Sequence, residues 1–173
     1  MTRAIALLER AQGRCDRVIE ELLDYTRVRD LDLRPTRVDD WLGTLLDEYD
    51  LPPTVTLQRK LNSGIEAALD RDRLGRSVRN VIDNACHAMY GKEGDDAEAG
   101  VRTLTVVTRV ADGRLELSVE DTGPGIPPGD EAKVFEPLFS TKSFGVSLGL
   151  PMVKQIMEQH GGGVEINSMA GCG

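Results

Sequence analysis

The first 28 residues show a heptad pattern of apolar positions that predicts one long helix. Residues 2–28 contain no proline and a single glycine, Gly13, and the apolar residues recur in alternating steps of four and three. This spacing forms one seam, as in a coiled coil or a helical bundle. The helix either packs on its own domain or belongs to a bundle whose other helices lie elsewhere, and we favour the bundle. The seam consists of Ala4, Leu8, Ala11, Cys15, Val18, Leu22 and Tyr25.

Beyond residue 34 the pattern alternates between helical and strand periods, which predicts an α+β fold. A helix capped by Asp39 or Asp40 ends at about residue 48, and the helical period returns over 72–89 and 148–160. Strand-like composition or alternation marks five further segments, which predicts an open sheet with helices on one face. These segments are 55–57, 65–69, 103–110, 114–120 and 164–167.

Two turn signals indicate how the predicted strands are connected. Asp112-Gly113 lies between two alternating segments, which predicts a tight hairpin. The sequence Asn-Ser-Gly at 62–64 separates the strands at 55–57 and 65–69 and predicts a turn between them. Residues 121–147 are rich in glycine, proline and serine and have no clear period, so we expect a long loop there.

Charge and composition exclude several classes of protein. The formal net charge of −8 argues against a nucleic-acid partner, because phosphate backbones require clustered Lys and Arg. No apolar run approaches the roughly 18 residues of a membrane span, and Glu9 interrupts the start of any signal peptide. We expect a cytoplasmic segment, whose longer parent could carry a membrane anchor. Cys15, Cys86 and Cys172 match no metal-ligand spacing. Cys15 and Cys86 fall at apolar helical positions and are expected to be buried free thiols.

Asn80 and Asn84 form the first candidate cluster. They lie four residues apart on the predicted helix over 72–89, so their side chains share one face. Amide oxygens are hard ligands suited to Mg²⁺, and amide NH₂ groups can donate hydrogen bonds to phosphate oxygens. Taken alone, the two residues are equally compatible with a pair of surface asparagines.

The second cluster is the sequence Asp-Thr-Gly-Pro-Gly-Ile at 121–126, directly after the predicted strand 114–120. A carboxylate at a strand end, here Asp121, can accept a hydrogen bond from an exocyclic amino group such as that of adenine. Gly123 and Gly125 let the backbone turn sharply and approach a flat ring without an intervening Cβ. An ordinary Asx turn at Asp121 would explain the same residues.

The third cluster joins a glycine-containing loop to the predicted helix over 148–160. The free N–H groups at such a helix start can bind phosphate, and Pro151 suits the first helical turn. Lys142 precedes Gly145 and Gly149 and can supply a point charge for terminal phosphates. The loop has neither Walker nor dinucleotide-binding spacing.

In this order the three clusters resemble the ATPase family shared by histidine kinases, DNA gyrase, heat-shock chaperones and mismatch-repair ATPases. The resemblance covers about residues 36–173 and implies a mixed sheet, helices on one face and a mobile ATP lid at about 125–147. Its motifs are an N box at 80–85, a first glycine box at 121–125, an F box at 135–139 and a second glycine box at 145–150.

Residues 20–27 resemble the second helix of the histidine kinase dimerisation domain. The resemblance therefore divides the chain into two parts. Residues 1–34 would be part of the dimerisation and phosphotransfer domain with its linker, and residues 35–173 the ATP-binding catalytic domain. In the parent protein, the helix over 2–28 would form a homodimer.

The resemblance also implies a Mg²⁺–ATP site. Asp121 would bind adenine, Asn84 would hold Mg²⁺ with Asn80 as a second candidate ligand, and Asn80 and Lys142 would act in catalysis. The implied nucleotide-binding residues are Asn80, Asn84, His87, Asp121, Gly123, Gly125, Ile126, Thr141, Lys142, Gly145, Leu148, Gly149 and Leu150.

Asn80 separates the kinase branch of this family from the hydrolase branch. The hydrolases carry Glu at that position, where it activates water, whereas Asn cannot act as a general base. The F box also favours the kinases. We therefore expect a protein histidine kinase that transfers the γ-phosphate of ATP to a histidine outside this chain. The phosphate would then pass to an aspartate in the receiver domain of a response regulator.

Several residues depart from the family pattern. Neither His87 nor His160 precedes an acidic residue, as a phosphoacceptor would, so this chain is not expected to autophosphorylate alone. His87 either contacts phosphate or packs on its helix, and His160 suits a helix C-terminus. Ser147 replaces a usual glycine, and the sequence at 171–173 stops before the family's closing strand, which we expect to be missing.

Two alternative functions stay open. One is a non-catalytic nucleotide-sensing or dimerisation module whose site Ser147 has impaired. The other is an ATPase, or a serine or keto-acid dehydrogenase kinase, of the same superfamily. ATP turnover or serine phosphorylation would favour the second alternative.

Overall fold

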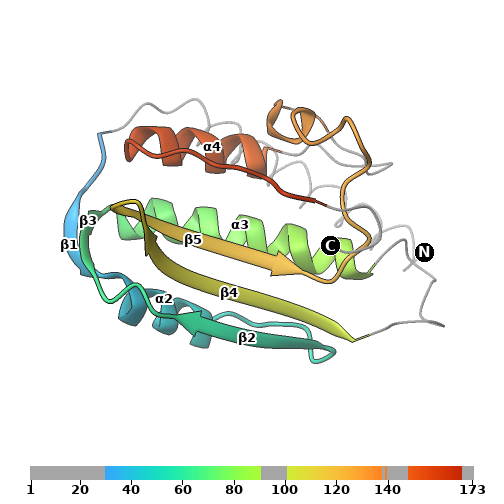
Figure 1. Cartoon of the computed structure of the whole chain (residues 1–173), viewed down its shortest axis with the longest axis horizontal. Coiled ribbons are helices and arrows are strands. Elements are labelled where there is room, and N and C mark those ends of the chain that lie inside the picture. Colours follow the sequence, from blue (N-terminus) through green and yellow to red (C-terminus); the bar gives the residue numbers. More distant parts are fainter. Residues whose placement is uncertain (1–29, 91–100, 138, 140–147, 169–173) are drawn as a thin grey trace, which may run out of the picture.

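The computed structural model describes residues 30–90, 101–137, 139 and 148–168 (Figure 1). Within these ranges the chain forms an α+β fold, as the sequence predicts. The elements are β1 Arg34–Arg37, α2 Val38–Asp47, β2 Val55–Leu61, β3 Glu66–Leu69, α3 Arg71–Tyr90, β4 Arg102–Ala111, β5 Arg114–Asp121, the 3₁₀ helix η2 Lys133–Phe135 and α4 Gly149–Gln159.

The larger sheet is mixed and has the strand order β2-β4-β5. β2 runs parallel to β4, with Val55 opposite Arg102, and β4 runs antiparallel to β5. Asp112 and Gly113 have φ angles of 51° and 74°, the left-handed conformations that a tight hairpin turn requires, so the predicted hairpin is confirmed. The helices α3 and α4 lie on one side of this sheet (Figure 1).

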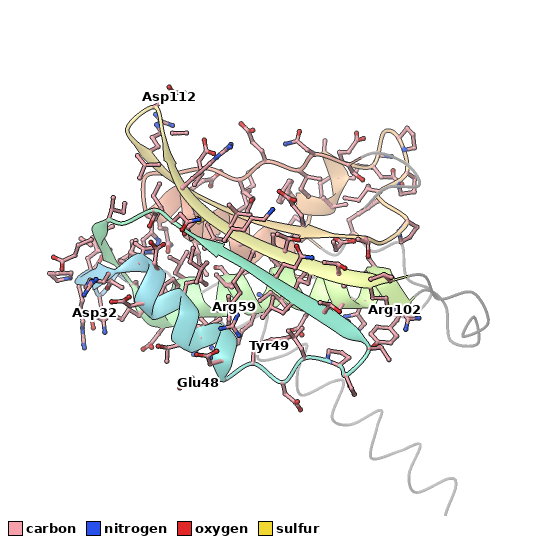
Figure 2. The ribbon with its side chains drawn as sticks, turned by 60° about the horizontal axis from the view of Figure 1, so that its bottom comes forward. Asp32, Glu48, Tyr49, Arg59, Arg102 and Asp112 are labelled. Atoms are coloured by element: carbon pink, nitrogen blue, oxygen red, sulfur yellow. The ribbon has the colours of Figure 1, made fainter. Side chains whose placement is uncertain are left out.

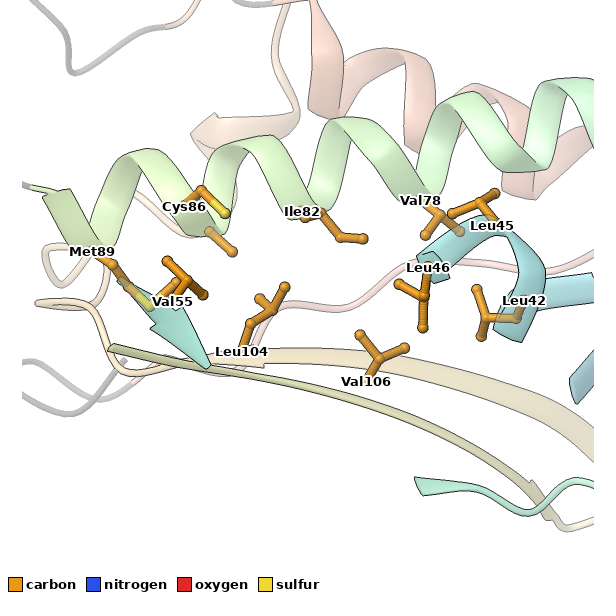
Figure 3. Packing of buried hydrophobic residues seen from close by; sticks show 11 residues of the cluster. Leu42, Leu45, Leu46, Val55, Val78, Ile82, Cys86, Met89, Leu104 and Val106 are labelled. Carbon is orange, nitrogen blue, oxygen red and sulfur yellow. The ribbon is translucent and has the colours of Figure 1, made fainter. Parts of the chain in front are cut away.

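The main core lies between α3, α2 and the inner face of the sheet (Figure 3). Ile82 of α3 and Leu104 of β4 are both fully buried. The helical period along α3 puts its apolar side chains on the face that meets the sheet, and the two-residue period of β4 supplies the opposite surface. This packing fixes the face of α3 that remains for Asn80 and Asn84.

The predicted turn at 62–64 does not join a hairpin. β2 pairs with β4, whereas β3 pairs antiparallel with β1, a strand that the sequence pattern did not predict. The carboxylate of Asp39 explains the separation, because it accepts hydrogen bonds from Ser63 Oγ (2.7 Å) and the Gly64 N–H (2.8 Å). The turn is therefore bound to α2 instead of folding β3 back onto β2.

Two further expectations about local structure were wrong. Neither Asp39 nor Asp40 caps α2, because the helix begins at Val38 and Arg37 precedes it without a side-chain cap. The carboxylate of Asp39 bonds the turn and Thr108 Oγ1 instead, the latter at 2.6 Å. Residues 164–167 form no strand, because no strand pairs with them within the described ranges.

Some predictions concern residues outside the described ranges. These are the long helix over 2–28, Cys15 and Cys172. Cys86 is a buried free thiol, as expected. In the part of the chain that the structure describes, none of the helices combines the length and the apolar character needed to cross a bilayer.

Candidate functional site

Asn80 and Asn84 lie against the start of α4, which brings two of the predicted clusters together. A Cβ built on Gly149 would be 3.7 Å from the Cβ and Cγ of Asn80 and 3.8 Å from Nδ2 of Asn84. Both asparagines are half-buried on the face of α3 that turns away from the sheet. The shared face predicted from their spacing therefore meets the N-terminus of α4.

The groups that meet here suit a bound anion and its cation. A Cβ on Gly149 would make only ordinary van der Waals contacts, so the packing of the protein does not itself require glycine there. Such a Cβ would instead occupy space beside the two amides. Leu148 supplies no side-chain cap to α4, and Pro151 stands in its first turn, so main-chain N–H groups at this helix start can donate to phosphate oxygens. The amide oxygens fit Mg²⁺.

Asp121 ends β5 and forms a tight turn with Gly123. Its Oδ1 accepts a hydrogen bond from the Gly123 N–H at 2.8 Å. A Cβ on Gly123 would be 2.6 Å from that oxygen and 3.2 Å from the Cβ of Ala88, so only glycine fits without a shift. Among the described residues, no hydrogen bond engages Oδ2 of Asp121. The Asx turn and the capacity to bind an amino group are thus compatible, because each uses a different oxygen.

Thr122 and Ala88 contribute to this region, and sequence reasoning did not single them out. Thr122 Oγ1 accepts a hydrogen bond from the Thr103 N–H at 3.0 Å and donates one to the Val101 carbonyl at 3.0 Å. These bonds hold the turn after β5 against the start of β4. Ala88 follows Asn84 by one helical turn, and that spacing was a signal that could have identified it.

Gly125 and Ile126 begin the segment predicted to be the lid. Gly125 has a φ angle of 75°, a conformation that favours glycine. The Ile126 N–H donates a hydrogen bond to Ser168 Oγ at 2.7 Å, so this end of the segment is attached to the chain that follows α4. Further along, η2 forms within the predicted loop.

Of the other predicted nucleotide-binding residues, two lie at the start of α4 and three lie outside the described ranges. Leu148 is 1% exposed, so its side chain belongs to the packed interior and only its backbone could meet a ligand. Leu150 is half-buried at the start of α4. Thr141, Lys142 and Gly145 lie outside the described ranges, as does Ser147.

His87 is exposed one turn from Asn84. Its Nδ1 lies 2.6 Å from the Asp83 carbonyl, which can only accept, so Nδ1 carries the proton and Nε2 remains for another partner. His160 lies at the other end of α4, where its ring contacts Asp70, and is not part of this site.

Asp83 points away from the asparagine face. The hydroxyl of Tyr49, at the C-terminal end of α2 (Figure 2), donates a hydrogen bond to Asp83 Oδ1. Burial, together with this bond and the charge of Asp83, raises the pKa of Tyr49. Burial also raises the pKa of the Cys86 thiol, helped by the charges of Asp83 and Asp121. Cys86 is therefore a protonated core residue, without the thiolate character of a nucleophile.

Comparisons with known proteins agree with this arrangement. Residues 69–173 match the family model described as "Histidine kinase-, DNA gyrase B-, and HSP90-like ATPase". The sensor histidine kinase ZraS of Klebsiella oxytoca is 34% identical over 175 residues, which cover 96% of this chain and 35% of ZraS. This chain therefore spans only about a third of that relative's length.

Two solved structures share the fold. Full-length ShkA in complex with AMPPNP superposes with a TM-score of 0.77 at 23% identity, over 98% of this chain and 36% of ShkA. Histidine kinase ThkA in complex with the response regulator protein TrrA gives a TM-score of 0.68 at 19% identity, over 92% of this chain and 45% of ThkA. Since the family model covers more than half of the sequence, this chain belongs to the histidine kinase-, DNA gyrase B- and HSP90-like ATPase family.

Proposed function

We propose that this chain is the ATP-binding catalytic domain of a sensor histidine kinase. The observation that carries the proposal is the meeting of Asn80 and Asn84 with Gly149, because it combines amide ligands and a helix N-terminus in one place. The similarity to ZraS over nearly the whole chain supports the kinase branch of the family. The AMPPNP complex of ShkA supports ATP as the nucleotide.

Asp121 would bind the adenine ring. Its Oδ1 is held by the Gly123 N–H, so Oδ2 is available to accept a hydrogen bond from the exocyclic amino group. Gly123 is buried beside Ala88, and the absence of a Cβ would let its backbone approach the flat ring. Gly125 and Ile126 would complete this pocket.

The phosphates would lie between α3 and α4. Main-chain N–H groups at 148–150 and at Gly145 would donate to their oxygens, with Thr141, Lys142 and His87 at the edge. Asn84, together with Asn80, would hold Mg²⁺, which neutralises phosphate charge when bound. The chain's own contribution is to orient the nucleotide and stabilise charge, because phosphoryl transfer requires little covalent chemistry from the protein.

Transfer to a protein histidine, in place of hydrolysis, is supported by the residue at position 80. An asparagine amide cannot remove a proton from water, so the site lacks a base at the position where the family's hydrolases carry Glu. The acceptor histidine would belong to a dimerisation helix that this chain does not contain. The ThkA complex with TrrA supports a response regulator as the next phosphate acceptor.

The proposed organisation follows from the same assignment. Residues 1–34 would be the second helix of the dimerisation domain with its linker, and residues 35–173 the catalytic domain. The parent protein would form a homodimer through the helix over 2–28, with this segment in the cytoplasm.

Calorimetric titration with Mg²⁺–ADP tests the nucleotide site. We expect saturable binding by the wild-type chain and loss of binding in Asp121→Asn. Asn can still accept the Gly123 N–H through its single oxygen, which leaves an NH₂ donor facing the adenine amino group. The turn should therefore survive while recognition fails. No binding by a folded wild-type chain would contradict the proposal and favour a non-catalytic module.

Radiolabelled ATP tests the reaction. The chain alone should not become labelled, and addition of a matching histidine-bearing domain should produce acid-labile phosphohistidine. Steady ATP turnover without an acceptor, or acid-stable label on serine, would instead identify another branch of the family.

A further inference from the structure

Asp70 joins three separate segments of the chain at the end of α3 opposite to Tyr90. This residue lies between β3 and α3 and is only 6% exposed. Its Oδ1 accepts the Arg73 N–H at 3.0 Å and thereby caps α3. Its Oδ2 accepts the Asp32 N–H at 3.1 Å, from the segment that precedes β1. One carboxylate therefore connects the start of α3 to residues 30–33.

The backbone of Asp70 is also bound to the end of α4. Its N–H donates to Nε2 of His160 at 3.1 Å, and Nδ1 of the same ring lies 2.8 Å from the Ile156 carbonyl. Because a carbonyl can only accept, Nδ1 carries the proton and Nε2 is the acceptor. Arg73 adds a second link, since its guanidinium donates to Gln159 Oε1 at 2.7 Å. The last turn of α4 is thus fixed to the first turn of α3.

α3 and α4 meet a second time at the candidate nucleotide site. Gly149 begins α4 beside Asn80, and Gln159 ends it beside Arg73. The 11 residues of α4 span about 16 Å at the usual helical rise. The segment 30–33 is therefore attached to the same helix pair as the candidate nucleotide site, about one helix length away from it. Figure 2 shows Asp32 at the opposite end of the molecule from Arg102.

A cavity lies beneath this attachment. Its volume is about 270 Å³, and it is bordered by Asp30 and Asp32 on one side and by Arg73, Gln155 and Gln159 on the other. Asp32 and Asp70 both line this cavity, and the bond between them joins the segment to the helical layer. This bond, with the bonds of Asp70 to Arg73 and His160, holds residues 30–33 beside α3 and α4.

We propose that Asp70 is a positioning residue for phosphoryl transfer, which sets the direction of residues 30–33 relative to the nucleotide site. The proposal rests on the proposed function, in which the phosphoacceptor belongs to the region upstream of this segment. The orientation of that region relative to the γ-phosphate then depends on the Asp32–Asp70 bond. Asp70 touches neither nucleotide nor acceptor, so it acts on the transfer rate and leaves nucleotide affinity unchanged.

Two substitutions separate this role from the capping of α3. Asp70→Asn keeps an oxygen for the Arg73 N–H but presents NH₂, a donor, to the Asp32 N–H. Asp70→Ser keeps a capping oxygen and removes the second acceptor. Both retain the main-chain bond to His160. Asp72→Asn is the matched control, because it removes an exposed charge from the same helical turn.

The first measurement is amide hydrogen exchange of the chain saturated with Mg²⁺–ADP. In both Asp70 variants, exchange of the Asp32 amide should accelerate at least about fivefold, while the Arg73 amide keeps its protection. The Asp72 control should exchange as wild type does. An Asp32 amide that exchanges at the wild-type rate in both variants would overturn the proposal.

The second measurement is phosphoryl transfer in the longer protein that carries the acceptor histidine. We expect kcat to fall at least about fivefold in both Asp70 variants, with KM for ATP and Kd for ADP within about twofold of wild type. Wild-type kcat in both variants, or a loss confined to nucleotide affinity, would overturn the positioning role. Failure of the wild-type protein to bind ADP would instead contradict the proposed function.

Discussion

Gly149 at the start of α4 faces Asn80 of α3 across a space in which a methyl group would be 3.7 Å from the asparagine Cβ. We predict that Gly149→Ala weakens Mg²⁺–ADP binding about tenfold or more, a loss of about 1.4 kcal/mol. The new methyl group would occupy space proposed for phosphate and Mg²⁺. Calorimetric titration measures the affinity.

The same substitution should not weaken the fold. The methyl group meets no atom closer than ordinary contact distance, and alanine favours helix over glycine by up to about 1 kcal/mol. The melting temperature should therefore stay constant or rise while affinity falls. Gly163→Ala is the control, because a Cβ there would meet nothing within 4 Å. Gly163 follows the C-terminal end of α4, whereas Gly149 begins this helix. Unchanged affinity in Gly149→Ala would place the phosphates elsewhere.

Gly123→Ala should have the opposite effect on stability. A Cβ at this position would be 2.6 Å from Oδ1 of Asp121, so the Asx turn must open. We expect a loss of about 1–3 kcal/mol in the free energy of unfolding, as for overpacked sites. Nucleotide affinity should also fall, because Asp121 is displaced. Chemical denaturation measures the free energy of unfolding of Gly123→Ala, and calorimetric titration measures its nucleotide affinity. If the variant were as stable as wild type, the Asx turn would relax around the new Cβ without a loss of stability.

Arg102 stabilises the C-terminal end of α3. Its guanidinium carbon lies 4.4 Å from the centre of the Tyr90 ring, and its Nε donates to the Met89 carbonyl at 3.1 Å. Arg102→Ala should lower the free energy of unfolding by about 1–2 kcal/mol, through loss of the cation–π contact and the hydrogen bond. Arg114→Ala, at an exposed position on β5, should change it little. Equal effects in the two variants would contradict this role.

The elements with strong local signals were predictable from the sequence. Asp112-Gly113 predicted its hairpin because the required backbone conformations depend on those two residues alone. The shared face of Asn80 and Asn84 followed from helical spacing, and the helix after Leu148 followed from its apolar period. The family resemblance then linked these segments into one site.

Long-range pairing was not predictable in this way. Nothing in the sequence of β2 shows that it pairs in parallel with β4, or that β3 pairs with β1. Those choices depend on tertiary bonds such as the one from Thr108 to Asp39, 69 residues apart. The same limitation explains why Asp39 was wrongly predicted to be a helix cap: its position near a helix start suggested a cap, but its partners are distant in the sequence. The role of Thr122 also depends on a partner strand.

The carboxylate of Asp39 should contribute stability that depends on pH. Burial alone would raise its pKa, but hydrogen bonds from Thr108, Gly64 and Ser63 outweigh burial and hold the pKa below its usual value. A pKa lowered by folding gives stability that is present above the unfolded value of about 3.9 and is lost as pH falls through the folded value.

Asp39→Asn should therefore destabilise the protein at pH 7, by about 1–3 kcal/mol, because an amide cannot accept all three bonds. The difference from wild type should begin to shrink below about pH 4, the unfolded value, because the unfolded chain then binds a proton that the folded carboxylate does not. It should shrink further as the pH falls through the lower folded pKa, where the folded Asp39 carboxylate loses its charge. Asp40→Asn is the control, since its exposed ion pair with Arg37 is worth at most about 1 kcal/mol. Denaturation curves at pH 7, 5 and 3 measure the difference. A gap between wild type and Asp39→Asn that stays constant with pH would mean that the Asp39 hydrogen bonds do not depend on its charge.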